Sequence, residues 1–281
     1  MFEDRVLSGM RPTGRLHIGH YHGALKNWVK LQEEYECLYF AADWHALTTH
    51  YESKESIAET VWEMFVDWLA AGINPTRATI FIQSRVAEHA ELTLLLGMIA
   101  PVGWLERVPT YKDTQQKLAD RDLSNYGFLG YPVMQAADIL IYRANMVPVG
   151  EDQVSHIELT REIARRFNNL YGDVFPEPDV LISEVPTLPG IYGQQKMSKS
   201  LNNAIMISDS ADAVNKLVAQ MYTDPKRTRA DIPGTVEGNP VFIYHDVFNP
   251  DTAEVDDLKE RYRAGKVGDV EVKKKLARAM N

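Results

Sequence analysis

The sequence is poor in cysteine and in long apolar runs. Cys37 is the single cysteine among 281 residues, so the chain cannot form an internal disulfide and offers no cysteine set for zinc or an iron–sulfur cluster. The longest apolar stretches are broken by charge before they reach bilayer length, and residues 1–5 lack the basic start of a signal peptide. These absences argue against a membrane protein and favour the cytoplasm as the location.

Positive charge is also in deficit. Asp and Glu number 39 against 30 Lys and Arg, and the formal net charge of −9 argues against a protein that coats nucleic acid by bulk electrostatics. Short basic runs at residues 226–229 and 273–275 leave room for a local basic surface, although such runs are more often ordinary solvated faces. The length predicts one large domain and one small one.

The first half of the sequence alternates apolar strands with amphipathic helices. Strands are predicted at residues 5–9, 38–42, 79–82 and 146–149, and helices from about residue 20, from Ser53 to Gly72 and from residue 150 through Phe167. Residues 138–142 fit a strand or a buried helix equally well. The alternation predicts an α/β fold with a parallel sheet, in which ligands bind beyond the carboxyl ends of the strands.

The second half of the sequence has a different pattern. Residues 176–193 are rich in proline and glycine and are predicted to be a loop. The apolar spacing then becomes helical, most clearly at residues 211–221 and 255–263. We therefore predict a larger domain over residues 1–204 and a smaller helical domain over residues 205–281.

A His-x-Gly-His turn spans residues 17–20, just after the first predicted strand and at the start of a helix. Helix N-termini present free N–H groups that suit a phosphate, and Gly19 lets a flat base or a phosphate approach the backbone. The imidazoles of His17 and His20 can donate hydrogen bonds to oxygens that gain charge in a transition state. Taken alone, the tetrapeptide fits an ordinary polar helix cap better, because short motifs match by accident.

A second motif, Lys-Met-Ser-Lys-Ser, occupies residues 196–200 after the Pro/Gly-rich segment. Lys196 and Lys199 can close on the β- and γ-phosphates of ATP and neutralise the departing pyrophosphate. The alternative is a surface loop of lysine and serine. A chance match to all five letters is on the order of one in ten thousand for a chain of this length, so this motif is far more specific than the first.

Together the two motifs resemble the HIGH and KMSKS signatures of class I aminoacyl-tRNA synthetases, in the same order and about 180 residues apart. Residues 9–21, 148–153 and 156–168 are similar to the members of that family that handle tryptophan and tyrosine. The resemblance implies a Rossmann-type nucleotide-binding domain followed by a helical domain that binds tRNA. It also implies activation of an amino acid with ATP, transfer to a tRNA, and a homodimer.

The resemblance assigns roles on the nucleotide side. His17, His20, Lys196 and Lys199 would be the catalytic groups. The implied ATP-binding residues are Arg11, Pro12, Thr13, Gly19, His20, Gly150, Glu151, Asp152, Leu188, Lys196, Met197, Ser198, Lys199 and Ser200. Mg²⁺ would be held mainly by the phosphates, with no protein ligand assigned. No protein nucleophile is implied, so catalysis would rest on positioning and on charge stabilisation.

On the amino-acid side, the implied residues are Asp138, Tyr131, Gln153, Gln135, Leu7 and His45. The spacing of Tyr131, Gln135 and Asp138 occurs in both aromatic subgroups and does not separate them. An indole N–H can only donate, so the buried acceptor at Asp138 suits it, and Leu7 stands where tyrosine-specific members place a second phenol. The resemblance therefore favours L-tryptophan and tRNA(Trp), with tyrosine as the runner-up. The alternatives are an ion pair between Asp138 and Arg143, and a core role for His45.

Two features depart from the family pattern. Thr114 stands where many tryptophan-specific members have a lysine for the pyrophosphate, and Lys112 or Lys117 is the candidate replacement. The chain ends at Asn281, where family members usually continue for several dozen residues, which weakens the case for anticodon binding by residues 205–281. Two readings outside the synthetases are a small nucleotidyltransferase, which would lack the second motif, and a synthetase-like paralogue that binds only ATP or a partner.

Overall fold

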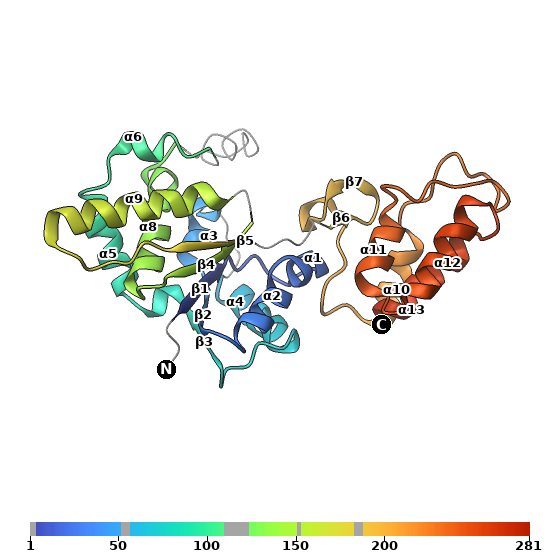
Figure 1. Ribbon diagram of the computed structural model, residues 1–281, viewed down its shortest axis with the longest axis horizontal. Helices are drawn as coiled ribbons and strands as arrows, with labels where there is room; N and C mark the ends of the chain where they lie inside the picture. Colours follow the sequence, from blue (N-terminus) through green and yellow to red (C-terminus); the bar gives the residue numbers. More distant parts are fainter. Residues whose placement is uncertain (1–3, 52–56, 110–123, 151–152, 183–187) are drawn as a thin grey trace. The chain divides into compact units, whose positions relative to one another are not determined.

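The computed structural model describes residues 4–51, 57–109, 124–150, 153–182 and 188–281. The chain divides into two compact units (Figure 1). Unit 1 contains residues 1–14 and 24–184, and unit 2 contains residues 15–23 and 185–281. Within the described ranges, every helix is either too short or too polar to cross a lipid bilayer.

Unit 1 is built on a parallel sheet of five strands in the order β3–β2–β1–β4–β5. The strands are β1 (Arg5–Met10), β2 (Glu36–Ala41), β3 (Ala78–Ile82), β4 (Met146–Val149) and β5 (Asp179–Ile182). The first four are short apolar runs, which is why the sequence predicts each of them. The expected parallel α/β fold is confirmed by this sheet.

The strand order reverses between β1 and β4. From β1 the chain moves outward through β2 to β3, whereas from β4 it moves the other way to β5. Ligands of open α/β sheets bind at such switch points, beyond the carboxyl ends of the strands. Arg11 directly follows β1 and Gly150 directly follows β4, so two of the predicted nucleotide-binding segments begin here.

The loop predicted over residues 176–193 is wrong in part, because strands lie within it, of which β5 belongs to the central sheet. β5 pairs with β4 residue for residue, from Met146 opposite Asp179 to Val149 opposite Ile182. The strand is only four residues long, lies at the sheet edge and follows a proline-rich stretch. Such a strand carries a weak pattern because only part of its surface is buried.

Helices lie on both faces of the sheet (Figure 1). On one face are α2 (Lys26–Leu31) and α4 (Ile57–Ala70); on the other are α5 (Glu88–Gly97), α8 (Tyr126–Ile141) and α9 (Val154–Tyr171). Trp28 of α2 stacks on Tyr39 of β2 at 4.4 Å and meets Trp68 of α4 edge-on at 5.1 Å. Further short helices are α3 (Asp43–His50), α6 (Val102–Leu105) and η2 (Gln83–Arg85). Ser53, the expected start of the helix that is now α4, lies outside the described residues.

Residues 138–142 belong to α8 and its C-cap, so the helical alternative holds for this segment. The Asn125 side chain caps α8 by accepting the backbone N–H of Phe128 at 2.9 Å. The helix face that packs on α5 and α9 is apolar and includes Val133 and Leu140. Asp138 is buried on the same helix, which makes its hydrogen bonding a central feature of the site.

Unit 2 is mainly helical, with α10 (Ala211–Ala219), α11 (Pro240–Phe248), α12 (Thr252–Arg263) and α13 (Asp269–Met280). Ser210, Asn239 and Asp251 cap three of these helices by accepting backbone N–H groups of the first turn. The helices predicted at residues 211–221 and 255–263 are confirmed as α10 and α12. The sequence pattern does not predict α11, because a helix that is apolar nearly all round shows no period.

The core of unit 2 extends back before residue 205. Leu188, Ile191 and Met197 are buried with Phe242 and Leu258 in one apolar cluster. The hairpin of β6 (Pro189–Gly190) and β7 (Gly193–Lys196), and the single turn η4 (Lys199–Leu201), therefore belong with the helices. Unit 2 therefore includes residues 185–204, which the sequence analysis assigned to the larger domain, because these residues pack in the core of unit 2.

Candidate functional site

The two signature motifs are brought together inside unit 2. The backbone N–H of Ile18 donates to the Ile205 carbonyl, and the N–H of Ile207 donates to the Leu16 carbonyl, each at 2.9 Å. These bonds make an antiparallel bridge between the histidine segment and the residues just after the lysine motif. Main-chain pairing therefore fixes the spacing of two motifs that lie about 180 residues apart in the sequence.

The two motif histidines form a stacked pair. Their ring centroids lie 3.7 Å apart, and the backbone N–H of His17 donates to Nδ1 of His20 at 3.3 Å. Among the described residues nothing hydrogen-bonds Nδ1 of His17, which is buried.

The pKa of His17 is lowered to about 4, first by burial and then by the charge of Lys199. The pKa of His20 is lowered to about 3, by burial, by His17 and by Lys199. Both rings are therefore neutral hydrogen-bonding groups at pH 7.

Gly19 is needed for this arrangement. A Cβ at that position would lie 2.9 Å from Nδ1 of His17 and 3.4 Å from Sδ of Met197. The histidine turn is the short helix α1 (Ile18–His20), which passes directly into the π-helical turn η1 (Tyr21–Leu25). Turns of this kind are rare and occur often at functional sites.

The lysine motif presents its charges from an anchored backbone. Met197 is buried in the core of unit 2, whereas Lys196 is exposed and Lys199 is partly exposed. Nζ of Lys199 donates to the carbonyl of Arg15 at 3.1 Å, which directs this ammonium towards the histidine segment. Leu188, one of the implied ATP-binding residues, is buried in the same core, and its carbonyl accepts the N–H of Met197 at 3.4 Å.

Asn203, which the sequence analysis did not single out, supports the lysine motif. Its Oδ1 accepts the backbone N–H of Ser198 at 2.7 Å, and its Nδ2 donates to the Lys196 carbonyl at 3.3 Å. The buried amide thus holds the lysine motif on both sides of Met197. A Cβ on Gly190 would lie 2.1 Å from Nδ2 of Asn203. The β6–β7 hairpin therefore needs glycine at position 190, where the Asn203 amide packs against its backbone.

The remaining predicted nucleotide-side residues follow strand ends in unit 1. Arg11 and Thr13 are exposed after β1, and the buried Pro12 accepts the Thr60 hydroxyl through its carbonyl at 3.3 Å. Gly150 is exposed after β4. Glu151 and Asp152, Thr114 with Lys112 and Lys117, and the side chain of Ser200 lie outside the described residues.

On the amino-acid side, Asp138 lies at the centre of a buried polar network. Its Oδ2 contacts Nε2 of His45 at 2.7 Å. Its Oδ1 accepts Nε2–H of Gln83 at 2.8 Å and contacts Nδ1 of His89 at 2.6 Å. Burial would raise the pKa of Asp138, but the imidazoles of His45 and His89 outweigh burial and hold that pKa below its ordinary value. The carboxylate partners are therefore two imidazoles and an amide, and Arg143 is not among the partners that the described residues provide.

Tyr131, Gln135 and Asp138 lie on one face of α8, as their spacing requires. The Tyr131 hydroxyl contacts Nε2 of the buried His156 at 3.3 Å, in the helix that Gln153 precedes. Gln135 is partly buried. Leu7 is 1% exposed and packs in the sheet core with Ile139, Val147 and Ile157. Of the predicted amino-acid-side residues, His45 and Asp138 are therefore in direct contact, and Tyr131 contacts His156 in the first turn of α9. Leu7 lies in the sheet core.

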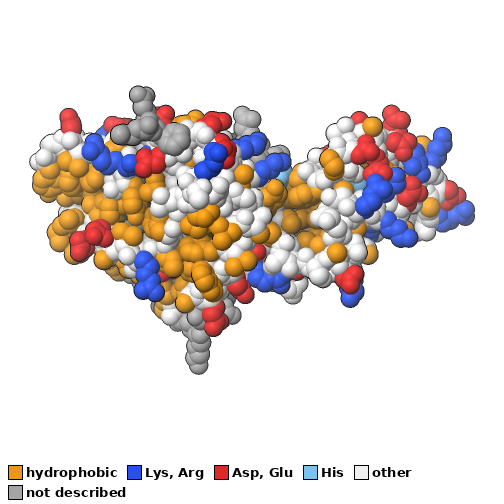
Figure 2. Space-filling model, turned by 90° about the horizontal axis from the view of Figure 1, so that it is seen from below, with side chains coloured by type: hydrophobic (Ala, Val, Ile, Leu, Met, Phe, Trp, Pro, Cys, Tyr) orange, Lys and Arg blue, Asp and Glu red, His pale blue; other side chains and the backbone are white. Residues whose placement is uncertain are grey.

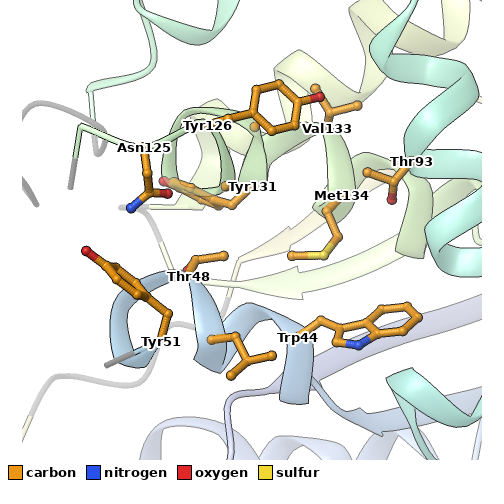
Figure 3. Close-up of a pocket in the computed structure, with 12 residues that line it drawn as sticks. Trp44, Thr48, Tyr51, Thr93, Asn125, Tyr126, Tyr131, Val133 and Met134 are labelled. Atoms are coloured by element: carbon orange, nitrogen blue, oxygen red, sulfur yellow. The ribbon is translucent and has the colours of Figure 1, made fainter. Parts of the chain in front are cut away.

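A pocket of about 490 Å³ opens beside this network (Figure 3). Trp44, Thr48 and Tyr51 come from α3 and its end, and face Tyr131 and Met134 of α8. Of the residues assigned to amino-acid binding, Tyr131 lines it, while Trp44 is the neighbour of His45. The lining is mainly apolar and aromatic, which suits a flat hydrophobic group.

The chain belongs to the class I tRNA synthetases of the tryptophan and tyrosine family, because the sequence model of the family described as "tRNA synthetases class I (W and Y)" matches residues 3–281. The resemblance drawn from the two motifs is confirmed. A tryptophan–tRNA ligase from Treponema pallidum is 55% identical over 280 residues, covering 99% of this chain and 82% of the relative. A tryptophan–tRNA ligase from Thermotoga maritima is 55% identical over 277 residues, covering 98% and 84%.

Solved structures agree with this placement. The tryptophanyl-tRNA synthetase of Campylobacter jejuni, complexed with ADP and tryptophan, has a TM-score of 0.87 at 35% identity and covers 99% of this chain and 85% of its own. The tyrosyl-tRNA synthetase of Archaeoglobus fulgidus has a TM-score of 0.73 at 23% identity, covering 100% and 87%, and shares the fold. The Rossmann-type fold with a helical C-terminal part is thereby confirmed.

Proposed function

We propose that this chain activates L-tryptophan with ATP to form tryptophanyl-adenylate and then transfers the tryptophan to tRNA(Trp). The observation that carries the proposal is the main-chain bridge that sets His17 and His20 beside the lysine motif. The names of the curated relatives support tryptophan as the amino acid, and the Campylobacter complex supports a nucleotide together with tryptophan.

The first step is attack of the tryptophan carboxylate on the α-phosphorus of ATP, with pyrophosphate as the leaving group. The neutral imidazoles donate N–H groups to phosphate oxygens without adding charge, while Lys196 and Lys199 neutralise the charge that builds up on the leaving pyrophosphate. In unit 1, Arg11 to Thr13 and Gly150 follow the strands that flank the switch point, where we place further contacts to the nucleotide. Catalysis then comes from positioning and electrostatics.

Tryptophan is selected by a buried acceptor. The Asp138 carboxylate is 1% exposed, and an indole N–H is a pure donor that matches it. Leu7 places an apolar side chain, not a phenol, at the matching position of β1, which disfavours tyrosine. The apolar and aromatic side chains that line the neighbouring pocket give the indole ring an apolar surface nearby.

Mg²⁺ fits this site only as a companion of the nucleotide. The described side chains at the two motifs are lysines and neutral imidazoles, which are poor ligands for a hard cation that prefers oxygen. Among the described residues, no group of three or more His, Cys, Asp and Glu side chains could hold a metal ion. We therefore propose that the triphosphate holds Mg²⁺ with retained waters.

A homodimer is proposed from the surface of unit 1. Leu94, Leu95 and Met98 of α5 are 63%, 56% and 72% exposed, and Tyr126 at the start of α8 is 82% exposed. Figure 2 shows apolar side chains gathered towards the end of unit 1 where Figure 1 places α5. Apolar patches of this kind mark interaction surfaces. We expect Leu95→Asp to shift sedimentation from dimer to monomer, and Val270→Asp on the exposed side of α13 to leave it unchanged.

The enzyme is proposed to act in the cytoplasm, where charged tRNA is used, with the helices of unit 2 binding the tRNA. The decisive experiment is pyrophosphate exchange into ATP, run in parallel with tryptophan and with tyrosine. We expect exchange that depends on tryptophan. Better exchange with tyrosine would replace the assignment, and ATP binding without exchange would favour the non-catalytic paralogue.

A further inference from the structure

The oxygens of Asp138 are not equally occupied. An ionised carboxylate has about four acceptor positions, two on each oxygen. On Oδ1 both positions are filled, by Gln83 at 2.8 Å and by His89 at 2.6 Å. On Oδ2 one position is filled, by His45 at 2.7 Å. The described contacts therefore leave one acceptor position, and it is on Oδ2.

The two donors on Oδ1 are themselves held in place. Oε1 of Gln83 accepts the backbone N–H of Trp44 at 3.2 Å, so the amide must turn its Nε2 towards Asp138. Because an ionised carboxylate only accepts, Nδ1 of His89 is the donor in that contact. The other ring nitrogen of His89, Nε2, contacts the hydroxyl of Tyr142 at 2.8 Å. Gln83 and His89 are 0% exposed, so water does not compete with these bonds.

These contacts join four elements at a single carboxylate. Asp138 lies on α8, one turn before the C-cap residue Tyr142. His89 lies on α5, Gln83 on η2 and His45 on α3. Two donors from fixed elements on Oδ1 prevent the carboxylate from turning about its Cβ–Cγ bond. The unfilled acceptor position on Oδ2 therefore points in one direction, as it must in order to bind a ring N–H selectively.

We propose that His89, supported by Tyr142, is a positioning residue that sets the preference for tryptophan over side chains of the same shape that lack a ring N–H. The inference rests on the proposed activation of tryptophan. His89 does not touch the substrate. It acts through Asp138, because losing the Nδ1–H donor leaves Gln83 as the one remaining described donor on Oδ1 and lets the carboxylate rotate away from the indole.

The test compares kcat/KM in pyrophosphate exchange for L-tryptophan and for 3-benzothienyl-L-alanine, in which sulfur replaces the ring N–H. In His89→Asn the amide nitrogen occupies the place of Nδ1 and keeps the donor to Asp138. In His89→Gln the amide nitrogen occupies the place of Nε2 and the donor to Asp138 is lost. His245→Asn is the matched control, because His245 is also 0% exposed and hydrogen-bonded but lies in unit 2.

We expect His89→Gln to lower the preference for tryptophan about tenfold, the size of one hydrogen bond to a charged group, through loss of kcat/KM for tryptophan alone. His89→Asn should keep most of the wild-type preference, losing only the share that the contact with Tyr142 contributes, and His245→Asn should keep all of it. An equal loss for both amino acids in His89→Gln, or the same loss in His89→Asn, would overturn the inference. If His89→Gln does not fold, Tyr142→Phe decides: a lowered preference supports the inference, and an unchanged one overturns it.

The two proposals fail in different ways. Wild-type protein that shows no tryptophan-dependent exchange removes the proposed function and this inference with it. Wild-type protein that discriminates, loses the discrimination in Asp138→Ala and keeps it in His89→Gln leaves the function intact and removes the role of His89.

Discussion

The backbone N–H of His17 donates to Nδ1 of His20, and the two rings stack face to face at 3.7 Å. An acceptor at Nδ1 requires that the neutral ring of His20 carry its proton on Nε2. Burial and the nearby lysines lower the pKa of His17 to about 4 and that of His20 to about 3. In NMR titration we expect the ring signals of both histidines to stay constant from pH 8 to about pH 5. Midpoints near 6.5 would contradict the geometry.

The same pKa shifts make stability depend on pH. The unfolded chain takes up protons on these rings near pH 6.5, whereas the folded chain does so only near pH 4 and below. Acid therefore favours the unfolded chain, and the free energy of unfolding should fall as the pH decreases from 6.5 towards 4. Denaturant unfolding at pH 7 and pH 5 should show a smaller fall in the double variant His17→Gln, His20→Gln. An identical fall in the double variant and in His22→Gln would count against the assignment.

Removal of the His20 donor should affect the chemical step. We expect His20→Ala to lower kcat of pyrophosphate exchange about 100-fold with little change in the KM for ATP, because the donor acts on charge that develops in the transition state. His20→Gln can place an amide N–H near the position of Nε2 and should recover part of the loss. His22→Ala is the matched control, and an equal effect there would show that the result is not specific to the donor.

The lysine motif should behave as a charge clamp. We expect Lys199→Ala to lower kcat by at least tenfold while the KM for tryptophan stays within about twofold, because the ammonium acts on the leaving pyrophosphate. Lys199→Arg keeps the charge and should lose less. Lys216→Ala on α10 removes a charge elsewhere in unit 2 and should be silent. A selective rise in the KM for tryptophan in Lys199→Ala would place that lysine elsewhere.

Asn203 should matter for both stability and rate. We expect Asn203→Leu to lower the free energy of unfolding by about 1–3 kcal/mol, because it leaves the N–H of Ser198 and the carbonyl of Lys196 without their partner. Exchange activity should fall as well, since the lysines lose their support. Asn202→Gly, at the neighbouring position, is the control. Asn202 has φ of 48°, a region that glycine adopts freely, so the free energy of unfolding of this variant should be unchanged or slightly raised.

Asp138 should discriminate amino acids, not nucleotides. We expect Asp138→Ala to weaken tryptophan use by about 1–3 kcal/mol, measured as kcat/KM in exchange, with the KM for ATP nearly unchanged. Arg143→Ala should leave tryptophan use unaltered, because Asp138 is held by His45, Gln83 and His89. A loss in Arg143→Ala as large as that in Asp138→Ala would restore the ion-pair interpretation.

The sequence predicts the parts of this molecule whose signal is local. Strands β1 to β4 are contiguous apolar runs, and the two motifs are contiguous segments of four and five residues, so each can be identified directly in the sequence. β5 is not predicted because an edge strand of four residues buries only part of its surface. The predicted domain boundary at residue 204 differs from the start of the last unit 2 segment, at residue 185, for a related reason. Leu188 and Met197 pack with Phe242, and such a contact exists only in the folded chain.

The supporting residues of the site could not be predicted, for a different physical reason. His89, Gln83 and Asn203 are single polar residues with no motif of their own. They become recognisable only because each is buried and its hydrogen bonds lead to Asp138 or to the lysine motif. In a sequence, a buried histidine and an exposed one look the same. The one available signal for Asn203 is its position three residues after the motif.

The chain crosses between the two units three times, after residues 14, 23 and 184. A single cut can therefore never release unit 2 intact. A fragment that begins at residue 185 would lack the edge that Leu16 and Ile18 supply to Ile205 and Ile207. Anyone who wishes to study the motif-bearing unit in isolation must graft residues 15–23 back onto it, for example through a short linker or as an added peptide.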